Sequence, residues 1–435
     1  MVRSKSNERG PAPRSLSDTR SDTHNKAAGD SPPGGSGQPL STRQLVATVA
    51  MTLAVQSLTS LVMAVPAVLA PVAAADFGYA PTAVGVLVSL AYVAAMLSGL
   101  AGGVMIARFG PIRLFQFAAG VAVTGLVLGA SAHIVLVFAA LTLIGGANGL
   151  VNPASSQILA RAAPPGVRVM VFSIKQTGVP LGAALCGVLL PALLLAMNWQ
   201  LALLAIAAAC LVFIPFLQPF RAMYDAERAP LGPLRLSAIL APLAEVWADR
   251  RMRELTLCSA VYSSVQLCLL TYLVSYLKLE LGYTLVVAGL VYSVASMTGV
   301  FARIVWGTVA DRLFKPRHVL AGLGIAMSAC GFVAASFNAH WPLSWVMIVA
   351  ALYAATAAAW NGVYLAEVAR MAPAERVATV TGGTQVFTFA GSMIGPPVFG
   401  AVVSASGSYA HGYILFAVLP LLMGLRLLRP PPVAR

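Results

Sequence analysis

Charged residues are scarce in this 435-residue chain: they make up 10% of the composition, and only 14 are Asp or Glu. Soluble domains average about 25% charged residues, so the composition excludes an ordinary water-soluble domain. Hydrophobic residues reach 59%, and the mean hydropathy is +0.83. The net charge is +14, yet no basic run is interleaved with stacking aromatic residues, so nucleic acid is not an expected partner.

Cysteines and catalytic motifs are also few. The five cysteines all lie in apolar stretches without metal-ligand spacing, so neither a metal site nor a disulfide framework is expected. The chain lacks a phosphate-binding G-x-x-x-x-G-K-[ST] loop, an H-E-x-x-H cluster and a G-x-S-x-G nucleophile elbow. We therefore expect neither an ATP-driven pump nor a hydrolase, and no enzyme activity, cofactor or bound metal.

Long apolar stretches recur along most of the chain. A helix that crosses a bilayer needs about 20 apolar residues, and the sequence contains twelve such stretches. They predict an all-α membrane protein with spans at 45–71, 83–107, 112–132, 134–157, 170–195, 199–220, 254–279, 284–309, 317–337, 341–365, 377–404 and 409–428.

The distribution of Lys and Arg predicts the direction of these spans. The connections after the even-numbered spans and the C-terminal end together hold eighteen Lys and Arg, whereas the odd-numbered connections hold one, Lys278. Cytoplasmic loops carry the positive excess. Both termini are therefore predicted to be cytoplasmic, and the residue usage together with the absence of organelle signals favours a bacterial inner membrane.

The N-terminal segment differs from the rest, because Ser, Pro, Gly, Asp and Arg dominate it. Such a composition buries too little apolar surface to order itself. We interpret residues 1–42 as a solvated cytoplasmic tail, with polybasic contact to lipid as the alternative. The other predicted divisions are a first half at 43–220, a cytoplasmic linker at 221–253, a second half at 254–429 and a short tail at 430–435.

The two predicted halves repeat each other. Gly103, Arg108 and Arg113 after the second span recur 204 positions later, after the eighth span. Farther along, the spacing becomes 209, and the residues that recur include Asn152, Arg161, Gln176 and Gly182. Both copies contain six spans and run in the same direction, which indicates a parallel repeat about an axis along the membrane normal.

Twelve spans in two parallel halves, with Gly-x-x-x-Asp-Arg type loops after spans 2 and 8, resemble the major facilitator superfamily. The resemblance covers about residues 45–428 and implies alternating access. It also implies that Arg108, Asp311 and Arg312 belong to loops that hold helix ends together as the halves rock. The first loop has Ala107 where the family usually has Asp. The alternative is that these loops are ordinary positive-inside anchors.

Two cations lie inside predicted spans. Lys175 is seven residues beyond Arg168 and Arg303 is nine residues before Arg312, which places them about 10 and 13 Å from the cytoplasmic helix ends. No Asp or Glu occurs in the interior of a predicted span. A charge at this depth is costly without a partner, so a bound anion is one explanation. Both side chains could instead extend to the cytoplasm, and Arg303 could bind main-chain carbonyls.

Uncharged polar residues complete the candidate site. Gln176 follows Lys175, Asn152 and Asn361 are related by the internal repeat, and Tyr364 shares a helical face with Asn361. Each could instead simply hydrogen-bond a neighbouring helix. The fold implied by the family resemblance places a substrate near the bilayer midplane between the halves, where these residues would meet.

The segment from Gly299 to Gly307 is also similar to the monocarboxylate-transporter branch of the superfamily, in which an Arg of this helix binds the substrate carboxylate. The branch has an Asp four residues before that Arg, which assists proton coupling, but Gly299 stands there in this chain. The branch also uses a Lys in its first helix, and the first span here contains none. The similarity therefore implies anion binding by Arg303 more strongly than proton coupling.

The sequence predicts a monomeric secondary transporter that moves a small organic anion, with a monocarboxylate as the expected class and proton-coupled import as the expected mode. Lys175 and Arg303 would neutralise the anion, and Gln176, Asn152, Asn361 and Tyr364 complete the predicted binding site. Efflux of a drug or hydrophobic solute is the alternative among transporters. A non-transporting membrane receptor is the alternative from another class.

Overall fold

The structure, a computed structural model, describes residues 41–430 except 79, 165–167, 227–242, 244–245 and 372–376. The described residues belong to one compact unit. Nearly all of the predicted tail 1–42, much of the predicted linker 221–253 and the terminal residues 431–435 therefore lie outside the described part of the chain.

Twelve helical segments in the described part of the chain are long and apolar enough to cross a membrane. They confirm the all-α membrane fold. The first half contains α1 (Thr42–Ala73), α2 (Val84–Phe109), α3 (Pro111–Gly129), α4 (Ile134–Ala162), α5 (Arg168–Gln176), α6 (Gly178–Ala196), α7 (Trp199–Phe213) and α8 (Arg221–Tyr224). The second contains α10 (Arg250–Leu279), α11 (Leu285–Arg312), α12 (Pro316–Ala335), α13 (Leu343–Ala357), α14 (Trp360–Met371), α15 (Val377–Ser406) and α16 (Tyr409–Leu428).

Two of the predicted spans are each formed by two helices. The fifth span breaks at Thr177, between α5 and α6, and the tenth breaks at residues 358–359, between α13 and α14. Pro180 contributes to the first break because it has no N–H to donate to the carbonyl four residues earlier. Irregular backbone at membrane depth needs other partners for its freed carbonyls.

The connections define two ends of the molecule. The arginine-rich end carries the connections after α2, α4, α8, α11 and α14, and the arginine-poor end carries those near residues 74–83, 130–133, 197–198, 280–284, 336–342 and 407–408. This alternation matches the charge pattern from which the direction of the spans was predicted.

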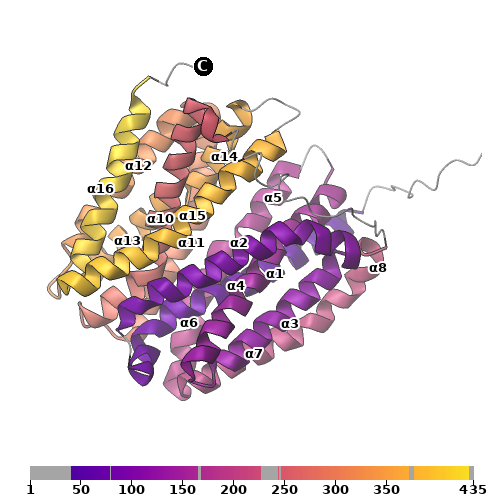
Figure 1. Cartoon of the computed structure of the whole chain (residues 1–435), viewed down its shortest axis with the longest axis horizontal. Helices are drawn as coiled ribbons and strands as arrows, with labels where there is room; N and C mark the ends of the chain where they lie inside the picture. The colour runs from indigo at the N-terminus through magenta and orange to yellow at the C-terminus, as the bar shows by residue number, and fades with distance from the viewer. Residues whose placement is uncertain are drawn as a thin grey trace, which may run out of the picture. The chain divides into compact units, whose positions relative to one another are not determined.

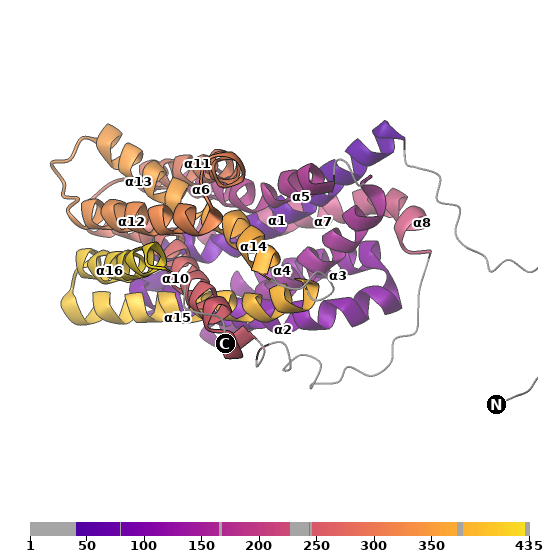
Figure 2. The same cartoon turned by 90° about the horizontal axis from the view of Figure 1, so that it is seen from above.

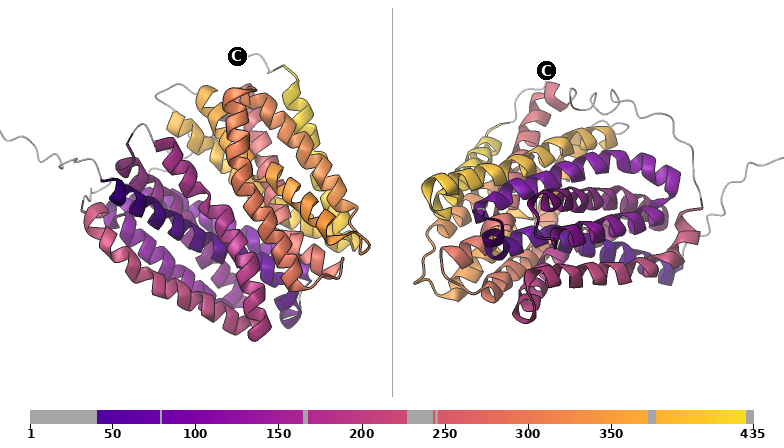
Figure 3. Two further views of the ribbon diagram at one scale, coloured as in Figure 1. Left: turned by 180° about the vertical axis from the view of Figure 1, so that it is seen from behind. Right: turned by 60° about the horizontal axis from the view of Figure 1, so that its bottom comes forward.

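The two halves pack against each other mainly through two pairs of helices, and α1 also packs against α10. One pair is α2 with α15, which run side by side in Figures 1 and 3, and the other is α6 with α11, which lie together in Figure 2. Close approach depends on small residues: a Cβ added at Gly289 of α11 would lie 2.2 Å from the Gly187 carbonyl oxygen of α6. Small interface residues let membrane helices pack closely.

Hydrogen bonds close the halves together at the arginine-poor end. Lys278 Nζ donates to the Pro71 carbonyl at 3.4 Å, and the Tyr272 hydroxyl donates to the Thr82 carbonyl at 3.0 Å. The Thr82 and Ser404 hydroxyls are 2.7 Å apart. Because these bonds join the first half to the second, the described structure is closed at this end.

At the arginine-rich end, each half fastens the start of its third helix. In the first half, Asp225 is 3% exposed and accepts hydrogen bonds from the backbone N–H groups of Ile112 and Arg113, at 2.9 and 3.1 Å. These N–H groups lie in the first turn of α3, where they have no partner within the helix. Gly110, at φ +89°, leaves room for the carboxylate, since a Cβ there would lie 2.4 Å from it.

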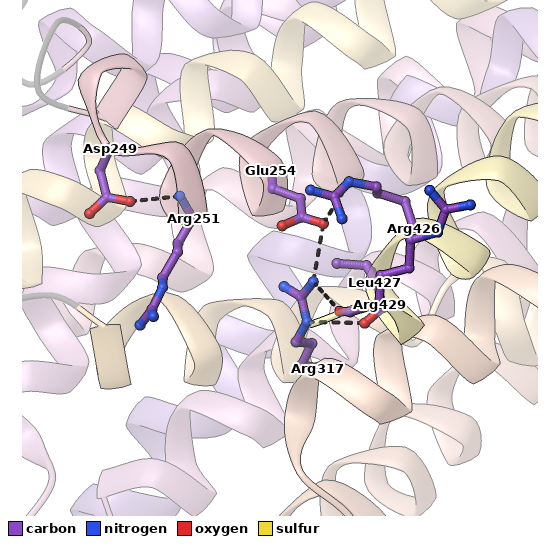
Figure 4. Close-up of polar contacts among 7 residues, drawn as sticks. All are labelled: Asp249, Arg251, Glu254, Arg317, Arg426, Leu427 and Arg429. Atoms are coloured by element: carbon purple, nitrogen blue, oxygen red, sulfur yellow. Dashed lines mark hydrogen bonds and ion pairs between the residues drawn. The ribbon is translucent and has the colours of Figure 1, made fainter. Parts of the chain in front are cut away.

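In the second half, Arg317 of α12 performs the corresponding fastening (Figure 4). Its guanidinium donates to the carbonyls of Leu427 and Arg429 at 3.0 and 3.2 Å, and to the buried carboxylate of Glu254 at 3.1 Å. Arg426 approaches the same carboxylate at 3.4 Å. The beginning of α12 is thereby tied to the end of α16 and the beginning of α10.

Candidate functional site

The candidate site begins with the buried amine of Lys175, near the end of α5. The residue is 2% exposed, and its Nζ donates to the side-chain oxygens of Asn152, in a short contact, and of Gln176, at 3.3 Å. Both acceptors are neutral amides, and both residues are exposed at the surface of the described structure. The lysine therefore lies beneath two polar side chains that a solute could reach.

Arg303 of α11 lies across the interface from this lysine. Its Nη1 donates to the carbonyl of Gln176 at 3.1 Å, and its Nε donates to the carbonyl of Ala358 at 2.9 Å. The first bond joins the two halves, whereas the second stays within the second half. The carbonyl-bonded role that the sequence left open for Arg303 is therefore present in this state.

The carbonyl of Gln176 is available to Arg303 for a local reason. In an uninterrupted helix this oxygen would accept from the N–H of residue 180, but that residue is proline. The carbonyl of Ala358 lies at the break between α13 and α14. Arg303 therefore binds backbone oxygens at two helix breaks, one in each half.

A small cavity adjoins Arg303. Its volume is about 40 Å³, and its walls come from α6, α10, α11 and the end of α13. A water molecule needs about 10–15 Å³ measured in this way, so the cavity accommodates water but not an organic substrate. Its polar wall residues include Gln266 and Ser296, in addition to Arg303.

The other predicted binding residues, Asn361 and Tyr364, lie just after the break between α13 and α14. Asn361 lies in the first turn of α14 and is half-buried. Tyr364 is fully buried and packs edge-on against Trp360, with ring centroids 5.7 Å apart. The structure thus joins Lys175, Gln176, Asn152 and Arg303 by hydrogen bonds, while Tyr364 points into the packed core of the second half.

The predicted gating residues lie at the arginine-rich end. Arg108 is exposed, with its guanidinium carbon 5.4 Å from the centre of the Phe109 ring. Arg312 is also exposed, at the last residue of α11. The Asp311 side chain lies outside the described side chains, so its predicted gating contact stays a prediction.

Sequence reasoning missed two contributors. The buried Ser296 hydroxyl lines the small cavity and has no hydrogen-bond partner among the described residues. The carbonyls bound by Arg303 were not singled out either. The Gln176 carbonyl has a signal in the sequence, because Pro180 stands four residues after it; the break at residues 358–359 has no comparable proline signal.

Comparison with known proteins identifies a matching family. The profile described as Major Facilitator Superfamily matches residues 52–396, which is more than half of the chain. No sequence among the curated proteins matches. The match supports the superfamily resemblance and does not test the narrower similarity to its monocarboxylate-transporter branch.

Solved structures share the fold at low sequence identity. A peptide transporter POT in complex with sulfate aligns with a TM-score of 0.72 and 16% identity, covering 89% of this chain and 97% of its own. A bacterial homolog of the human lysosomal transporter Spinster, inward-facing and unoccupied, has the same score and identity, with 89% and 96% covered. A POT family transporter in complex with 5-aminolevulinic acid aligns at 0.72 and 13%, with 89% and 95% covered.

Proposed function

This chain belongs to the Major Facilitator Superfamily and is a multi-pass secondary transporter with a small-molecule substrate, and we propose that its substrate is a small organic anion. A monocarboxylate is the class that fits the two cations best. We place the protein in a bacterial inner membrane, as a monomer with both termini in the cytoplasm.

The single observation that carries the proposal is the neutrality of the partners of Lys175 and Arg303. Both cations lie within membrane spans, and their oxygen partners are amides and backbone carbonyls. Among the described residues, no carboxylate forms an ion pair with either of them. Charges at this depth pair with one another or with backbone carbonyls, and they mark substrate pathways. A substrate carboxylate would supply the negative charge.

The residues then take distinct roles. Lys175 and Arg303 neutralise the carboxylate, and the amides of Gln176, Asn152 and Asn361 orient it. Arg303 makes a planar, two-pronged donor that matches a carboxylate. The two described bonds use two of its five N–H donors, so a carboxylate could bind the remaining donors or replace the Gln176 carbonyl, whose bond joins the halves.

Alternating access requires that the two ends of the protein open in turn. With the arginine-rich end in the cytoplasm, the bonds at Thr82 and Pro71 close the outer side of the protein in this state. Arg108, Asp311 and Arg312 would act at the opposite gate. Import coupled to protons remains part of the proposal, with the proton carried either on the substrate, which is then neutral while it moves, or on another group of the protein.

One structural neighbour supports the substrate class. The POT family transporter in complex with 5-aminolevulinic acid binds a small molecule that carries a carboxyl group. At 13% identity the comparison shows only that a protein of this fold can hold such a ligand. Efflux of a hydrophobic solute has one observation in its favour, a large apolar cavity, but that cavity lies within the first half.

Ligand-dependent stabilisation tests the proposal. Purified protein is screened with small carboxylates and with matched amides, and the shift in melting temperature is measured for wild type, Lys175→Ala and Arg303→Ala. A ligand stabilises the native state in proportion to the logarithm of its concentration over its Kd. Arg113→Ala is the control, because Arg113 is an exposed cation outside the interface.

We expect carboxylates to stabilise the wild type and the Arg113→Ala control, and both site variants to lose that stabilisation. Full stabilisation of both site variants would show that the two charges are structural and would overturn the proposal. Uptake of the same carboxylate into proteoliposomes separates a transporter from a receptor, since a receptor binds the ligand without moving it.

A further inference from the structure

The first half contains a second cavity, away from the cations. Its volume is about 280 Å³, and it lies between the arginine-poor ends of α1, α2, α3, α4 and α7. Its deep walls are formed by buried apolar side chains, among them Leu69, Leu126, Ile144 and Leu203. We call it the first-half pocket.

The side chains that line the first-half pocket offer it almost no polar atoms. The lining residues are Val, Leu, Ile, Ala, Gly, Pro, Phe and Trp. The indole N–H of Trp199 donates to Asp76 at 2.5 Å, so the polar atom of the one lining residue with a side-chain N–H is already bonded. A water molecule needs two to four polar partners, so this pocket is unsuited to water.

The mouth of the pocket is apolar and lies within the membrane-spanning region. Val86 of α2 and Phe138 of α4 line it and are 52% and 41% exposed. Both residues belong to candidate membrane spans. A mouth of this kind admits the apolar part of a lipid.

The length of the first-half pocket matches one leaflet. Its α4 wall extends from Ile134 to Ile144, which is about 15 Å at the helical rise per residue. The hydrocarbon core of a bilayer is about 30 Å thick, so one leaflet contributes about half of this. The wall begins at the membrane end of α4 and finishes near the middle of the span.

We propose that the first-half pocket binds one acyl chain of a bilayer lipid from the leaflet at the arginine-poor end. An empty pocket would deprive its wall atoms of dispersion contacts, and protein interiors rarely tolerate voids of this size. A lipid chain restores these contacts without dehydrating polar groups. The proposal does not depend on the identity of the transported substrate.

The bound chain also supports the closed gate. Residues of α1 between 65 and 73 contribute to the pocket, as do residues between 81 and 87, at and just before the start of α2. The same helix ends present the Pro71 carbonyl to Lys278 and the Thr82 carbonyl to Tyr272. An acyl chain behind these ends holds them against the second half, and it therefore stabilises the state closed at the arginine-poor end.

A pair of glycines on α3 provides a matched test. Gly129 lines the pocket, and a Cβ added there meets nothing closer than 3.6 Å, so Gly129→Leu fills the space without a backbone clash. Gly120 lies on the same helix outside the pocket, with nothing within 4 Å of an added Cβ. Gly120→Leu therefore controls for the substitution itself.

Occupancy is read from the fluorescence of Trp199. The full-length chain is reconstituted in nanodiscs of phosphatidylcholine with or without bromine atoms on the acyl chains, and the Trp199→Phe variant supplies the background from the other tryptophans. We expect bromine to quench the Trp199 component, and Gly129→Leu to reduce that quenching by about half or more because it displaces the adjacent chain. Gly120→Leu should match the wild type.

Gate support is read from the disulfide yield of a Thr82→Cys, Ser404→Cys pair. We expect delipidation to lower the yield in the wild-type and Gly120→Leu backgrounds, and Gly129→Leu to make the yield independent of lipid. Equal quenching in both leucine variants would overturn the lipid site, and a lipid-independent yield in wild type would overturn the gate support. Displacement of the brominated chain by a water-soluble apolar solute that is then transported would identify a substrate site instead.

Discussion

The α2–α15 and α6–α11 interfaces between the halves are related by the internal repeat, but only one of them carries charge. The α6–α11 interface has Lys175 close by, at the end of α5, and Arg303 on α11 itself. Counting by the repeat spacings of 209 and 204, the corresponding positions are Thr384 on α15 and Gly99 on α2. The α2–α15 interface is therefore neutral at the two positions where the other is cationic.

The difference shows that a duplicated fold need not keep a duplicated site. Each half has one cation and lacks the equivalent of the other, so both cations meet at a single interface. They also differ in what they bind: Lys175 binds side chains of its own half, whereas Arg303 binds backbone carbonyls of both halves. Arg303 is therefore the cation that can respond to separation of the halves.

The contacts that hold the start of the third helix also differ between the two halves. Arg113 and Arg317 are repeat equivalents, yet Arg113 is exposed and Arg317 is bonded to Glu254 and two carbonyls. In the first half a carboxylate binds N–H groups, and in the second half a guanidinium binds C=O groups. The contact therefore occurs at the start of the third helix in both halves, but the side chain is the acceptor in the first half and the donor in the second.

Arg317→Ala should have the largest effect on stability. It leaves the carboxylate of Glu254, which is 7% exposed, with only the more exposed Arg426. Breaking a buried pair costs about 3–5 kcal/mol, and the remaining partner lowers our expectation to about 2–3 kcal/mol. The matched variant Arg113→Ala should cost less than about 0.5 kcal/mol. Melting temperatures in detergent measure both, and equal losses would show that the two halves are fastened alike.

Asn152→Asp should have the next largest effect, and it acts on the charged interface. The new carboxylate would give Lys175 a resident anion at the position of its present amide partner. We expect the Kd for a carboxylate ligand to rise about tenfold, which corresponds to about 1.4 kcal/mol. Asn148→Asp, one turn earlier on α4, is the control for added charge. Titration of the melting temperature with ligand gives both Kd values, and unchanged affinity in Asn152→Asp would place the anion elsewhere.

Asp225→Ala tests the first-half fastening. The substitution removes the acceptor of two N–H groups at the start of α3, and loss of such a cap costs about 1 kcal/mol. Asp225→Asn retains one oxygen acceptor and should recover part of the stability. If the asparagine and alanine variants melt together, hydrogen bonding at this helix start contributes little and the comparison with Arg317 fails.

Much of the fold could be predicted from the sequence, because a bilayer imposes length, apolarity and charge asymmetry on each span. The apolar stretches predicted the positions of all twelve spans, and α16 coincides with its predicted range 409–428. The break at residues 358–359 could not be predicted in this way, because Trp360 and its neighbours continue an apolar run without a proline.

The site was harder to predict. The position of a polar residue in a span indicates its depth in the membrane, but not which neighbouring segment its side chain contacts. The depths of Lys175 and Arg303 were readable from their distance to the flanking arginines. Their partners were not, since the partners of Arg303 are backbone oxygens of other segments. Tyr364 illustrates the limit: it shares a face with Asn361 by helical spacing, but that face turns into the aromatic core beside Trp360.

Pro180→Ala should have the smallest effect and is the sharpest test of how Arg303 joins the halves. The alanine regains an N–H that can bond to the Gln176 carbonyl, so it competes with Arg303 for that oxygen. A net hydrogen bond is worth about 0.5–1.5 kcal/mol. Gln176 and Arg303 lie in the arginine-rich half of their spans, so sharing this bond should shift the population about threefold towards the state that is open at the arginine-rich end and closed at the arginine-poor end. The disulfide yield between Thr82→Cys and Ser404→Cys measures this population.

The control for Pro180→Ala is a double-mutant cycle. In an Arg303→Gln background the guanidinium is absent, so the Gln176 carbonyl no longer accepts a hydrogen bond from it. Pro180→Ala should then leave the disulfide yield unchanged. A coupling energy between the two positions isolates their interaction from the general effect of removing a proline. Equal effects of Pro180→Ala in both backgrounds would mean that the proline acts only on its own helix. The charged interface would then hold the halves together no differently from the neutral one.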